Sequence, residues 1–169
     1  PQVRASRGRL LATLGRRDEA KEEMHLAVGA FEEAADHGAL AGVLNDLAIE
    51  YLQQGQLDEG RALLRRGMAA IQLAGTTMPS LLLHVAILET SLGRPDLAEE
   101  PLINLVAAQR RSNDRAPLGQ ALCVLAHVLF DLGRTDEAEA AYEEGLGLLR
   151  GVADPLVLRS ALEARSLMD

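Results

Sequence analysis

The fold is set by the stretch Leu132-Gly133-Arg134-Thr135-Asp136-Glu137-Ala138, because versions of it occur four times in the chain. The other versions occupy residues 14–20, 54–60 and 92–98. Their glycines are spaced by 40, 38 and 40 residues, and an aspartate follows each glycine three residues later. A repeat period of about forty residues predicts an array of similar structural units rather than a single mixed core.

Each version of the stretch predicts a tight turn between two helices. Glycine just past a helix adopts the left-handed conformation that closes the last turn. Aspartate at the start of the next helix is expected to accept a hydrogen bond from a free backbone N–H, and its charge suits the helix dipole. Glu99 and Glu139 follow Asp96 and Asp136 by three residues, so capping boxes are expected there. The sequence therefore predicts four helical hairpins.

Small residues at fixed distances from the glycines predict close packing within each hairpin. They stand seven residues before and five residues after each glycine: Gly8, Ala20, Ala48, Gly60, Ala86, Ala98, Ala126 and Ala138. Large apolar residues stand eleven, eight and four residues before and nine residues after the glycines, at helical spacing, with Arg4, Arg7 and Glu89 as departures. Gly60, Gly67 and Gly145 are expected to soften the second helices, since glycine costs about 1 kcal/mol against alanine there. Pro101 is expected to kink its helix or loosen the first turn.

The composition favours an all-α chain with an aliphatic core. Apolar residues make up 48% of the 169 residues and aromatic residues 2%, and the alternating β-branched pattern of strands is missing. Turn-forming clusters delimit about nine helices, which are expected at residues 3–14, 18–36, 39–53, 58–74, 79–92, 96–112, 117–132, 136–150 and 155–167. We expect a right-handed superhelical stack of antiparallel helical hairpins, an α-solenoid.

The repeats divide the chain into one expected domain, residues 1–169. Its repeats cover residues 1–38, 39–78, 79–116 and 117–153, and a terminal helix follows at 154–169. The chain begins with Pro1 rather than Met, so it is expected to be a piece of a longer protein.

Charge and cysteine content narrow the function classes. The net charge of −8 argues against nucleic acid as a partner. The single cysteine, Cys123, excludes an internal disulfide and fits a reducing compartment. Apolar runs stay well below the ~18 residues of a membrane span, so no membrane partner is expected. Lys21 is the only lysine among many arginines, which favours a bacterial source, and we expect a cytoplasmic protein.

Residues 44–59, Leu-Asn-Asp-Leu-Ala-Ile-Glu-Tyr-Leu-Gln-Gln-Gly-Gln-Leu-Asp-Glu, closely resemble a tetratricopeptide repeat, and residues 132–138 with Tyr142 are similar to one. The resemblance covers about 150 residues. The period exceeds the family's usual length of about 34 residues. It is similar to the long-repeat variety of bacterial signalling and transcriptional regulators and of kinesin light chains. HEAT and armadillo repeats, which share the longer period, are the alternative fold.

The resemblance implies a partner-binding concave face formed by the first helix of each hairpin. In the first repeat the residues ten, six and three before the turn glycine are Ala5, Arg9 and Ala12. The residues expected to bind a partner stand at or beside the same places before Gly55, Gly93 and Gly133: Asn45, Ile49, Leu52, Gln53, Leu83, Ile87, Thr90, Cys123, His127, Phe130 and Asp131. This predicted strip is apolar for a surface that faces solvent. It would hold an apolar or helical peptide, or be covered by neighbouring repeats, a missing segment or a second copy of the chain.

Catalytic chemistry has little support in the sequence. Cys123 and His127 share one helix face, which would suit a thiolate–imidazole pair or half a metal site. A buried cysteine beside an ordinary histidine is the simpler interpretation. We therefore predict a non-catalytic interaction or regulatory module that binds a protein or peptide, without metal or cofactor. The alternatives are a homo-oligomeric scaffold and, third, a thiol or metal enzyme.

Overall fold

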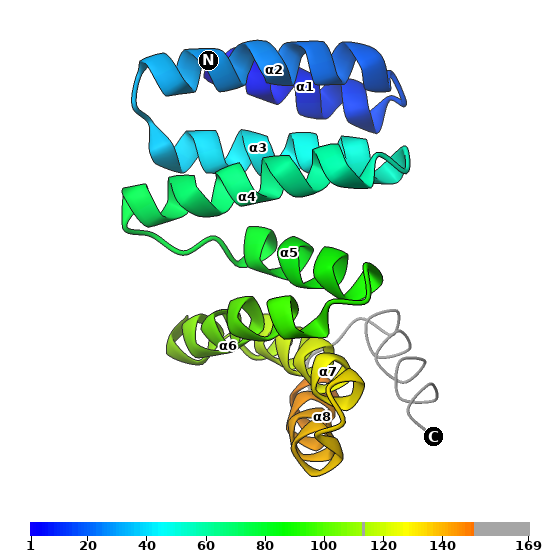
Figure 1. The fold of residues 1–169 in the computed structure, drawn as a ribbon. Helices are drawn as coiled ribbons and strands as arrows, with labels where there is room; N and C mark the ends of the chain where they lie inside the picture. The colour runs from blue at the N-terminus through cyan, green and yellow to red at the C-terminus, as the bar shows by residue number, and fades with distance from the viewer. Residues whose placement is uncertain (113, 151–169) are drawn as a thin grey trace. The chain divides into compact units, whose positions relative to one another are not determined.

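A computed structural model describes residues 1–112 and 114–150, and every regular element in those ranges is an α-helix. The helices are α1 (Gln2–Thr13), α2 (Arg17–Glu33), α3 (His37–Gln53), α4 (Leu57–Ala74), α5 (Pro79–Ser91), α6 (Pro95–Ser112), α7 (Arg115–Asp131) and α8 (Thr135–Leu149) (Figure 1). The all-α prediction is confirmed, and these eight helices lie close to the predicted ranges. The ninth predicted helix, 155–167, lies outside the described residues.

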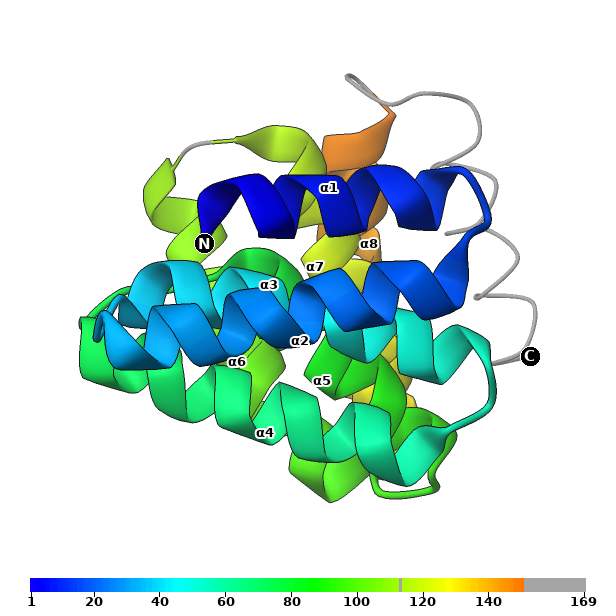
Figure 2. The same cartoon turned by 90° about the horizontal axis from the view of Figure 1, so that it is seen from above.

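The chain forms two compact units, Pro1–His84 and Val85–Asp169, with the boundary inside α5. In the first unit α1 and α2 form one antiparallel hairpin and α3 and α4 form the next (Figure 1; Figure 2). In the second unit α7 and α8 form a hairpin, and α6 packs against α7. The grouping of all four repeats into one domain stays a prediction. In the described part of the chain no helix is long and apolar enough to cross a bilayer.

The turn glycines adopt the predicted left-handed conformation, with φ between 69° and 76° at Gly15, Gly55, Gly93 and Gly133. The residue after each glycine donates its backbone N–H to a carbonyl five residues earlier. These bonds run from Arg16 to Leu11, Gln56 to Tyr51, Arg94 to Glu89 and Arg134 to Leu129, at 2.9 to 3.0 Å. Four turns of one geometry therefore satisfy the last carbonyls of the four preceding helices.

The predicted aspartate caps are wrong. The N-cap residues of α2, α4 and α8 are Arg16, Gln56 and Arg134, and none of them makes a side-chain capping bond. The aspartates instead lie in the first turn of each helix, where their charge still favours the helix dipole. The helices begin one residue earlier than expected, so the aspartates lie too far along the helix to cap it.

The capping boxes predicted at Glu99 and Glu139 lack their capping aspartates, because Asp96 and Asp136 lie in the first turn of α6 and α8. Arg134 pairs with Glu137 at the start of α8, at 2.7 Å from Nε, and its other donor group reaches Glu99 of α6. Arg16 pairs with Glu19 in the same way at the start of α2, at 2.6 Å from Nε. At the starts of α2 and α8 the N-cap arginine therefore pairs with the glutamate three residues later, and Arg134 also holds Glu99, one of the two glutamates predicted for a capping box.

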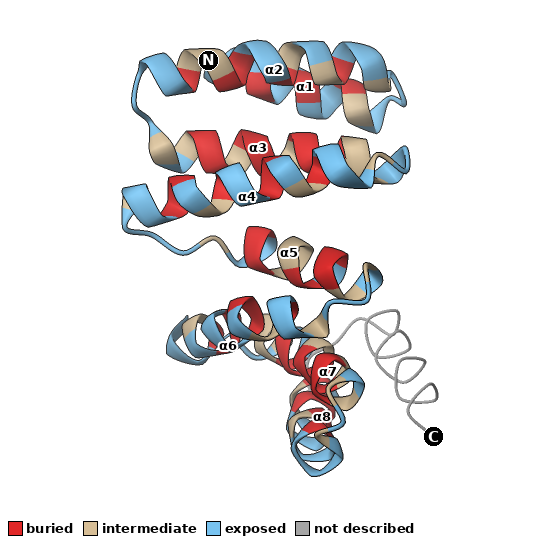
Figure 3. Ribbon diagram, viewed as in Figure 1, coloured by how far each residue is buried: buried red, intermediate tan, exposed pale blue. Residues whose placement is uncertain are grey.

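The paired small residues lie in the core, as predicted. All six alanines of the set are fully buried, and Gly8 and Gly60 are buried with them. An added Cβ at Gly8 would lie 3.2 Å from the Ala20 carbonyl oxygen, and one at Gly60 would lie 3.4 Å from that of Ala48. The buried residues gather on the faces by which the helices pack (Figure 3). Close approach of the backbones is therefore confirmed.

Gly145 has a packing role that the sequence did not reveal. Its carbonyl oxygen lies 3.0 Å from a Cβ placed on Gly119, and the Gly119 oxygen lies 3.0 Å from a Cβ placed on Gly145. Besides the loss of helix propensity expected of this glycine, it lets α7 and α8 touch backbone to backbone here.

Pro101 lies buried inside α6, which continues past it to Ser112. The first turn of this helix contains a bond from Leu97 N to Arg94 O, three residues back. The helices α2, α4 and α8 begin with bonds that reach four residues back. The start of α6 therefore differs from those of the other second helices, and a kink at Pro101 stays a prediction.

Candidate functional site

The predicted strip is divided between the two units. Asn45, Ile49, Leu52 and Gln53 lie on α3 and Leu83 lies on α5, all within the first unit. The other six residues belong to the second unit.

An open groove of about 240 Å³ lies on the first unit and is referred to here as the α1–α3 groove. Arg9, Ala12 and Thr13 of α1 form one side of its lining, and Met24 of α2 also contributes. The rest of the lining comes from α3: Asp46, Ile49, Glu50 and Gln53. Two residues of the predicted strip, Ile49 and Gln53, thus border a real depression beside α1.

Two arginines of the first hairpin reach polar groups of α3 along this groove. Arg9 donates to Asp46 at 3.1 Å. Arg17 donates to the side-chain oxygen of Gln53 and lies 3.5 Å from a carboxylate oxygen of Glu50. Asp46, Glu50 and Gln53 are spaced by four and three residues, so one helical face presents a row of oxygen acceptors.

Glu50 is the functional candidate that the sequence reasoning missed. Its side chain lines the groove, yet the residue is only 6% exposed. Its Oε2 accepts no hydrogen bond from the described residues. Glu50 stands five residues before the turn glycine, where later repeats have Leu88 and Val128. A carboxylate at an aliphatic position was the signal available in the sequence.

Asn45 lies in the interior, contrary to the solvent-facing placement expected for it. It is buried, and its Oδ1 accepts a hydrogen bond of 2.8 Å from Nδ1 of His84 on α5. Burial lowers the pKa of His84, while the nearby Asp46 opposes that shift. Asn45 therefore joins α3 to α5 within the first unit.

Leu52 and Leu83 are only partly exposed in the first unit. The Cδ2 of Leu52 lies 2.5 Å from where a Cβ on Gly60 would stand, so Leu52 covers the small residue of α4. Of the five predicted residues in this unit, Ile49 and Gln53 are those that line the groove.

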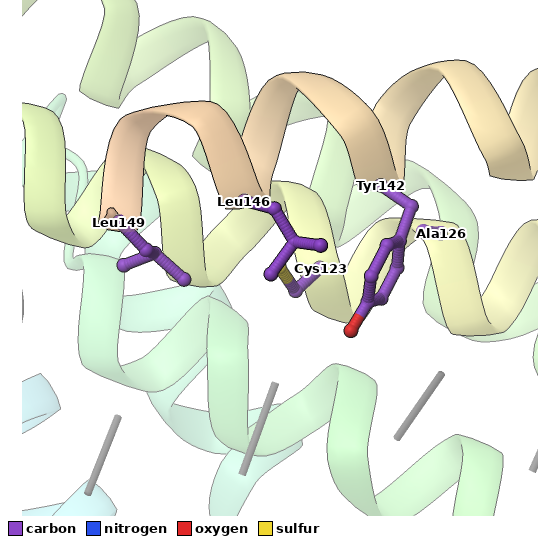
Figure 4. Packing of buried hydrophobic residues seen from close by; sticks show 5 residues of the cluster. All are labelled: Cys123, Ala126, Tyr142, Leu146 and Leu149. Carbon is purple, nitrogen blue, oxygen red and sulfur yellow. The ribbon is translucent and has the colours of Figure 1, made fainter. Parts of the chain in front are cut away.

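Cys123 is a core residue of the second unit, not part of an exposed strip. It packs with Ala126, Tyr142, Leu146 and Leu149 between α7 and α8 (Figure 4). Burial raises the pKa of the Cys123 thiol to about 11, so the thiol stays protonated at neutral pH. This environment disfavours a nucleophilic role for Cys123.

The remaining predicted residues of the second unit are open to solvent to different degrees. Ile87 and Asp131 are exposed, while Thr90, His127 and Phe130 are partly buried. Nε2 of His127 lies 3.8 Å from the Asp131 carboxylate one turn later. The described residues contain no group of three or more His, Cys, Asp or Glu side chains placed to hold a metal ion.

Two family models described as tetratricopeptide repeat match the sequence, one at residues 77–151 and the other at residues 1–26 and 41–66. Together these matches cover well over half of the chain. No curated protein sequence matches it.

Several solved structures share the fold. BtubC (BKLC) from P. vanneervenii is 20% identical, with a TM-score of 0.77 over 89% of this chain. Aspartyl phosphate phosphatase F from Bacillus subtilis is 15% identical, with a TM-score of 0.82 over 99%. This chain spans 63% and 44% of the lengths of those two proteins. The TPR-like repeats of a Podosopora anserina protein named as a kinesin light chain are 19% identical, with a TM-score of 0.74 over 98% of this chain and 86% of theirs.

Proposed function

Because the chain belongs to the tetratricopeptide repeat family, we propose that it is a non-catalytic interaction module that binds a protein or peptide segment along the first helices of its hairpins. Stacked helical repeats present extended surfaces of this kind. We further propose that the partner segment is a peptide and that the module has a regulatory role inside a longer protein. The cytoplasmic and bacterial setting remains a prediction from composition.

The observation that supports binding is the α1–α3 groove. It is open, it lies beside the first helices of two successive hairpins, and it combines the apolar side chains of Ala12 and Ile49 with polar groups from both helices. Apolar walls with a few fixed polar groups are typical of recognition sites. In the second unit the exposed Ile87 and the partly exposed Phe130 are the corresponding candidates for contact with a partner.

A displayed library of random peptides, selected on the immobilised chain, tests this function. The variant Ile49→Arg places a long charged side chain at the groove, and Leu73→Arg is the matched control on an exposed apolar residue of α4. Enriched peptides should bind the wild type and Leu73→Arg alike. They should lose roughly tenfold or more in affinity for Ile49→Arg, equivalent to about 1.4 kcal/mol. Selection that enriches nothing, or peptides indifferent to Ile49→Arg, would contradict the proposal.

Self-association is a second candidate, supported by an apolar row on α1. Val3, Leu10 and Leu14 are 82%, 59% and 63% exposed and share one helical face. Forty residues later, the counterparts of Val3 and Leu10 are Val43 and Glu50, which are 2% and 6% exposed. Two of the three positions in the α1 row are therefore covered in the next hairpin, while Gln54, the counterpart of Leu14, is exposed.

Sedimentation against concentration tests self-association through this row. If a second copy covers α1, the chain should form dimers or larger assemblies, and Leu10→Arg should return it to the monomer. Leu73→Arg again serves as the control, since it changes an exposed leucine outside the row. A monomer at all concentrations would remove this candidate.

A further inference from the structure

We propose that the α1–α3 groove binds the charged end of a lysine or arginine side chain of the partner segment, with the Glu50 carboxylate as its acceptor. This inference rests on the proposed function and names the chemistry of the partner. It is based on the burial and hydrogen bonding of Glu50, on its position in the repeat, and on the size and lining of the groove.

The first observation is that a buried carboxylate lacks a hydrogen bond. Glu50 is only 6% exposed, and its Oε2 accepts no hydrogen bond from the described residues, although Arg17 lies 3.5 Å from this same atom. A carboxylate removed from water is costly unless donors satisfy its oxygens. Glu50 lines the groove, and the proposal requires its carboxylate, whose Oε2 is buried, to turn toward a donor that enters there.

The second observation is that packing does not require a carboxylate here. The equivalent residues Leu88 and Val128 are 4% and 0% exposed, so aliphatic side chains fill this position in the later repeats. An aliphatic residue at position 50 would avoid the desolvation cost altogether. The first unit instead has a charge at this position, which favours a binding role for it.

Arg17 does not complete the coordination of Glu50. Its guanidinium approaches the carboxylate to 3.5 Å but donates its hydrogen bond to the Gln53 side chain. Arg17 is partly exposed to solvent, so this ion pair is partly screened. On the other side of the row, Arg9 holds Asp46 through a pair in which Arg9 is about half exposed. The Arg9–Asp46 pair is the more exposed of the two, and pairs of this kind contribute little to stability.

The size and lining of the groove fit one long cationic side chain. A volume of about 240 Å³ lies below the ~300–1,000 Å³ of ordinary small-molecule sites, so the groove suits a single side chain. Ala12 and Ile49 provide apolar contact for the methylenes of lysine or arginine, and Glu50 accepts from the head group. The net charge of −8 also attracts a basic partner over longer distances.

Capped tripeptides with arginine, lysine or glutamine between two glycines test this assignment. Nuclear magnetic resonance titrations of the chain would follow the backbone signals of Ile49 and Gln53 and the carboxyl carbon of Glu50. The arginine or lysine peptide should shift these signals saturably. Comparison of the two titrations shows which cation is preferred. The glutamine peptide should not shift them. Absence of saturable shifts with both cations, or equal shifts with glutamine, would overturn the proposal.

Variants separate the carboxylate from the groove itself. Glu50→Gln keeps the shape and should weaken cation binding by roughly tenfold or more. Glu32→Gln is the matched control, because Glu32 is an exposed carboxylate paired with Arg66 outside the groove. Ala12→Leu fills the groove, leaves Glu50 in place and should also abolish binding, which keeps the test valid if Glu50→Gln fails to fold. Wild-type affinity in either folded variant would overturn the proposal.

The outcome can be distinguished from failure of the proposed function. If library peptides bind through Ile49 while neither cationic tripeptide binds, the interaction module stands and the cationic partner is wrong. If neither kind of peptide depends on the groove, both proposals fail.

Discussion

The α3–α4 and α7–α8 hairpins have a glycine at the same repeat position, but the two glycines have different surroundings. Gly67 and Gly145 both stand twelve residues after a turn glycine. A Cβ on Gly67 would meet two methyl carbons of Leu81 at 3.1 Å and the Ala41 oxygen at 3.8 Å. A Cβ on Gly145 would meet the Gly119 oxygen at 3.0 Å and Sγ of Cys123 at 2.9 Å. A side chain can move aside, but a backbone carbonyl in a packed helix cannot.

The difference arises on the facing helix, fourteen residues before the turn glycine. This position is Ala41 in α3 and Gly119 in α7. With glycine on both sides, α7 and α8 approach until each backbone meets the other, whereas Ala41 retains a Cβ in the α3–α4 hairpin. Equivalent sequence positions therefore differ in their tolerance to substitution according to their partner across the hairpin.

The largest effect is expected at Cys123, which the tight α7–α8 crossing buries. Its repeat counterpart in α3 is Asn45, which is hydrogen-bonded to His84. Because burial raises the pKa of Cys123 from 9.0 to about 11, its thiolate fraction near neutral pH is about 100-fold below that of an ordinary thiol. Reaction with a chromogenic disulfide reagent should be slower by at least that factor in the native chain than in the chain unfolded in urea.

The same pKa shift gives a sign for stability against pH. The unfolded chain releases the thiol proton at lower pH than the folded chain does, so the free energy of unfolding should fall as pH rises from 9.0 towards about 11. Cys123→Ala serves as the control and should remove that part of the decline. Equal thiol reactivity in the native and unfolded chains would show that the crossing is looser than the structure indicates.

Gly145→Ala is expected to destabilise the α7–α8 hairpin. Overpacking costs about 1–3 kcal/mol, and the gain in helix propensity returns up to about 1 kcal/mol, so a net loss of about 1–2 kcal/mol is expected. Urea unfolding gives the loss, and hydrogen exchange should place it in α7 and α8. The Cys123 thiol should become more reactive in this variant, since its Sγ is one of the atoms displaced. Unchanged stability would contradict a backbone contact at this crossing.

Gly147→Ala is the matched change two residues further along α8 and is expected to have the opposite sign. No heavy atom lies within 4 Å of an added Cβ there. The alanine should therefore stabilise the chain by about 0.5–1 kcal/mol through helix propensity alone. A destabilisation like that of Gly145→Ala would mean that any side chain in this part of α8 is unfavourable. The contact between Gly119 and Gly145 would then not explain the difference between the α7–α8 and α3–α4 hairpins.

The sequence predicted the elements of the fold because periodic local signals specify them. The glycines with positive φ, the small residues of the core and the helix ranges each depend on interactions within one hairpin, and they recur four times. The aspartate caps were mispredicted because a shift of one residue in a helix start separates a cap from the first turn. Local patterns alone do not set that start.

The candidate site was less predictable because it depends on contacts between hairpins. Helical spacing placed Ile49 and Gln53 beside the groove, but it could not show that Asn45 would be buried by His84 or that Cys123 would pack against Leu146. Glu50 was assigned to no surface, because its burial depends on the preceding hairpin and on Arg17. Residues that face a neighbouring repeat and residues that face solvent share the same 3.6-residue period.

Gly67→Ala completes the comparison and is expected to have the smallest effect. The new methyl group would require the two Cδ atoms of the fully buried Leu81 to move by a few tenths of an ångström, while the Ala41 oxygen stays at ordinary contact distance. The cost of that shift should offset the propensity gain, leaving a net change within about 1 kcal/mol of zero. Urea unfolding of Gly67→Ala beside Gly145→Ala measures the difference between the two crossings directly. Equal losses in both variants would mean that the Leu81 side chain moves no more easily than the Gly119 carbonyl. Gly119 would then not be the reason why position 145 requires glycine.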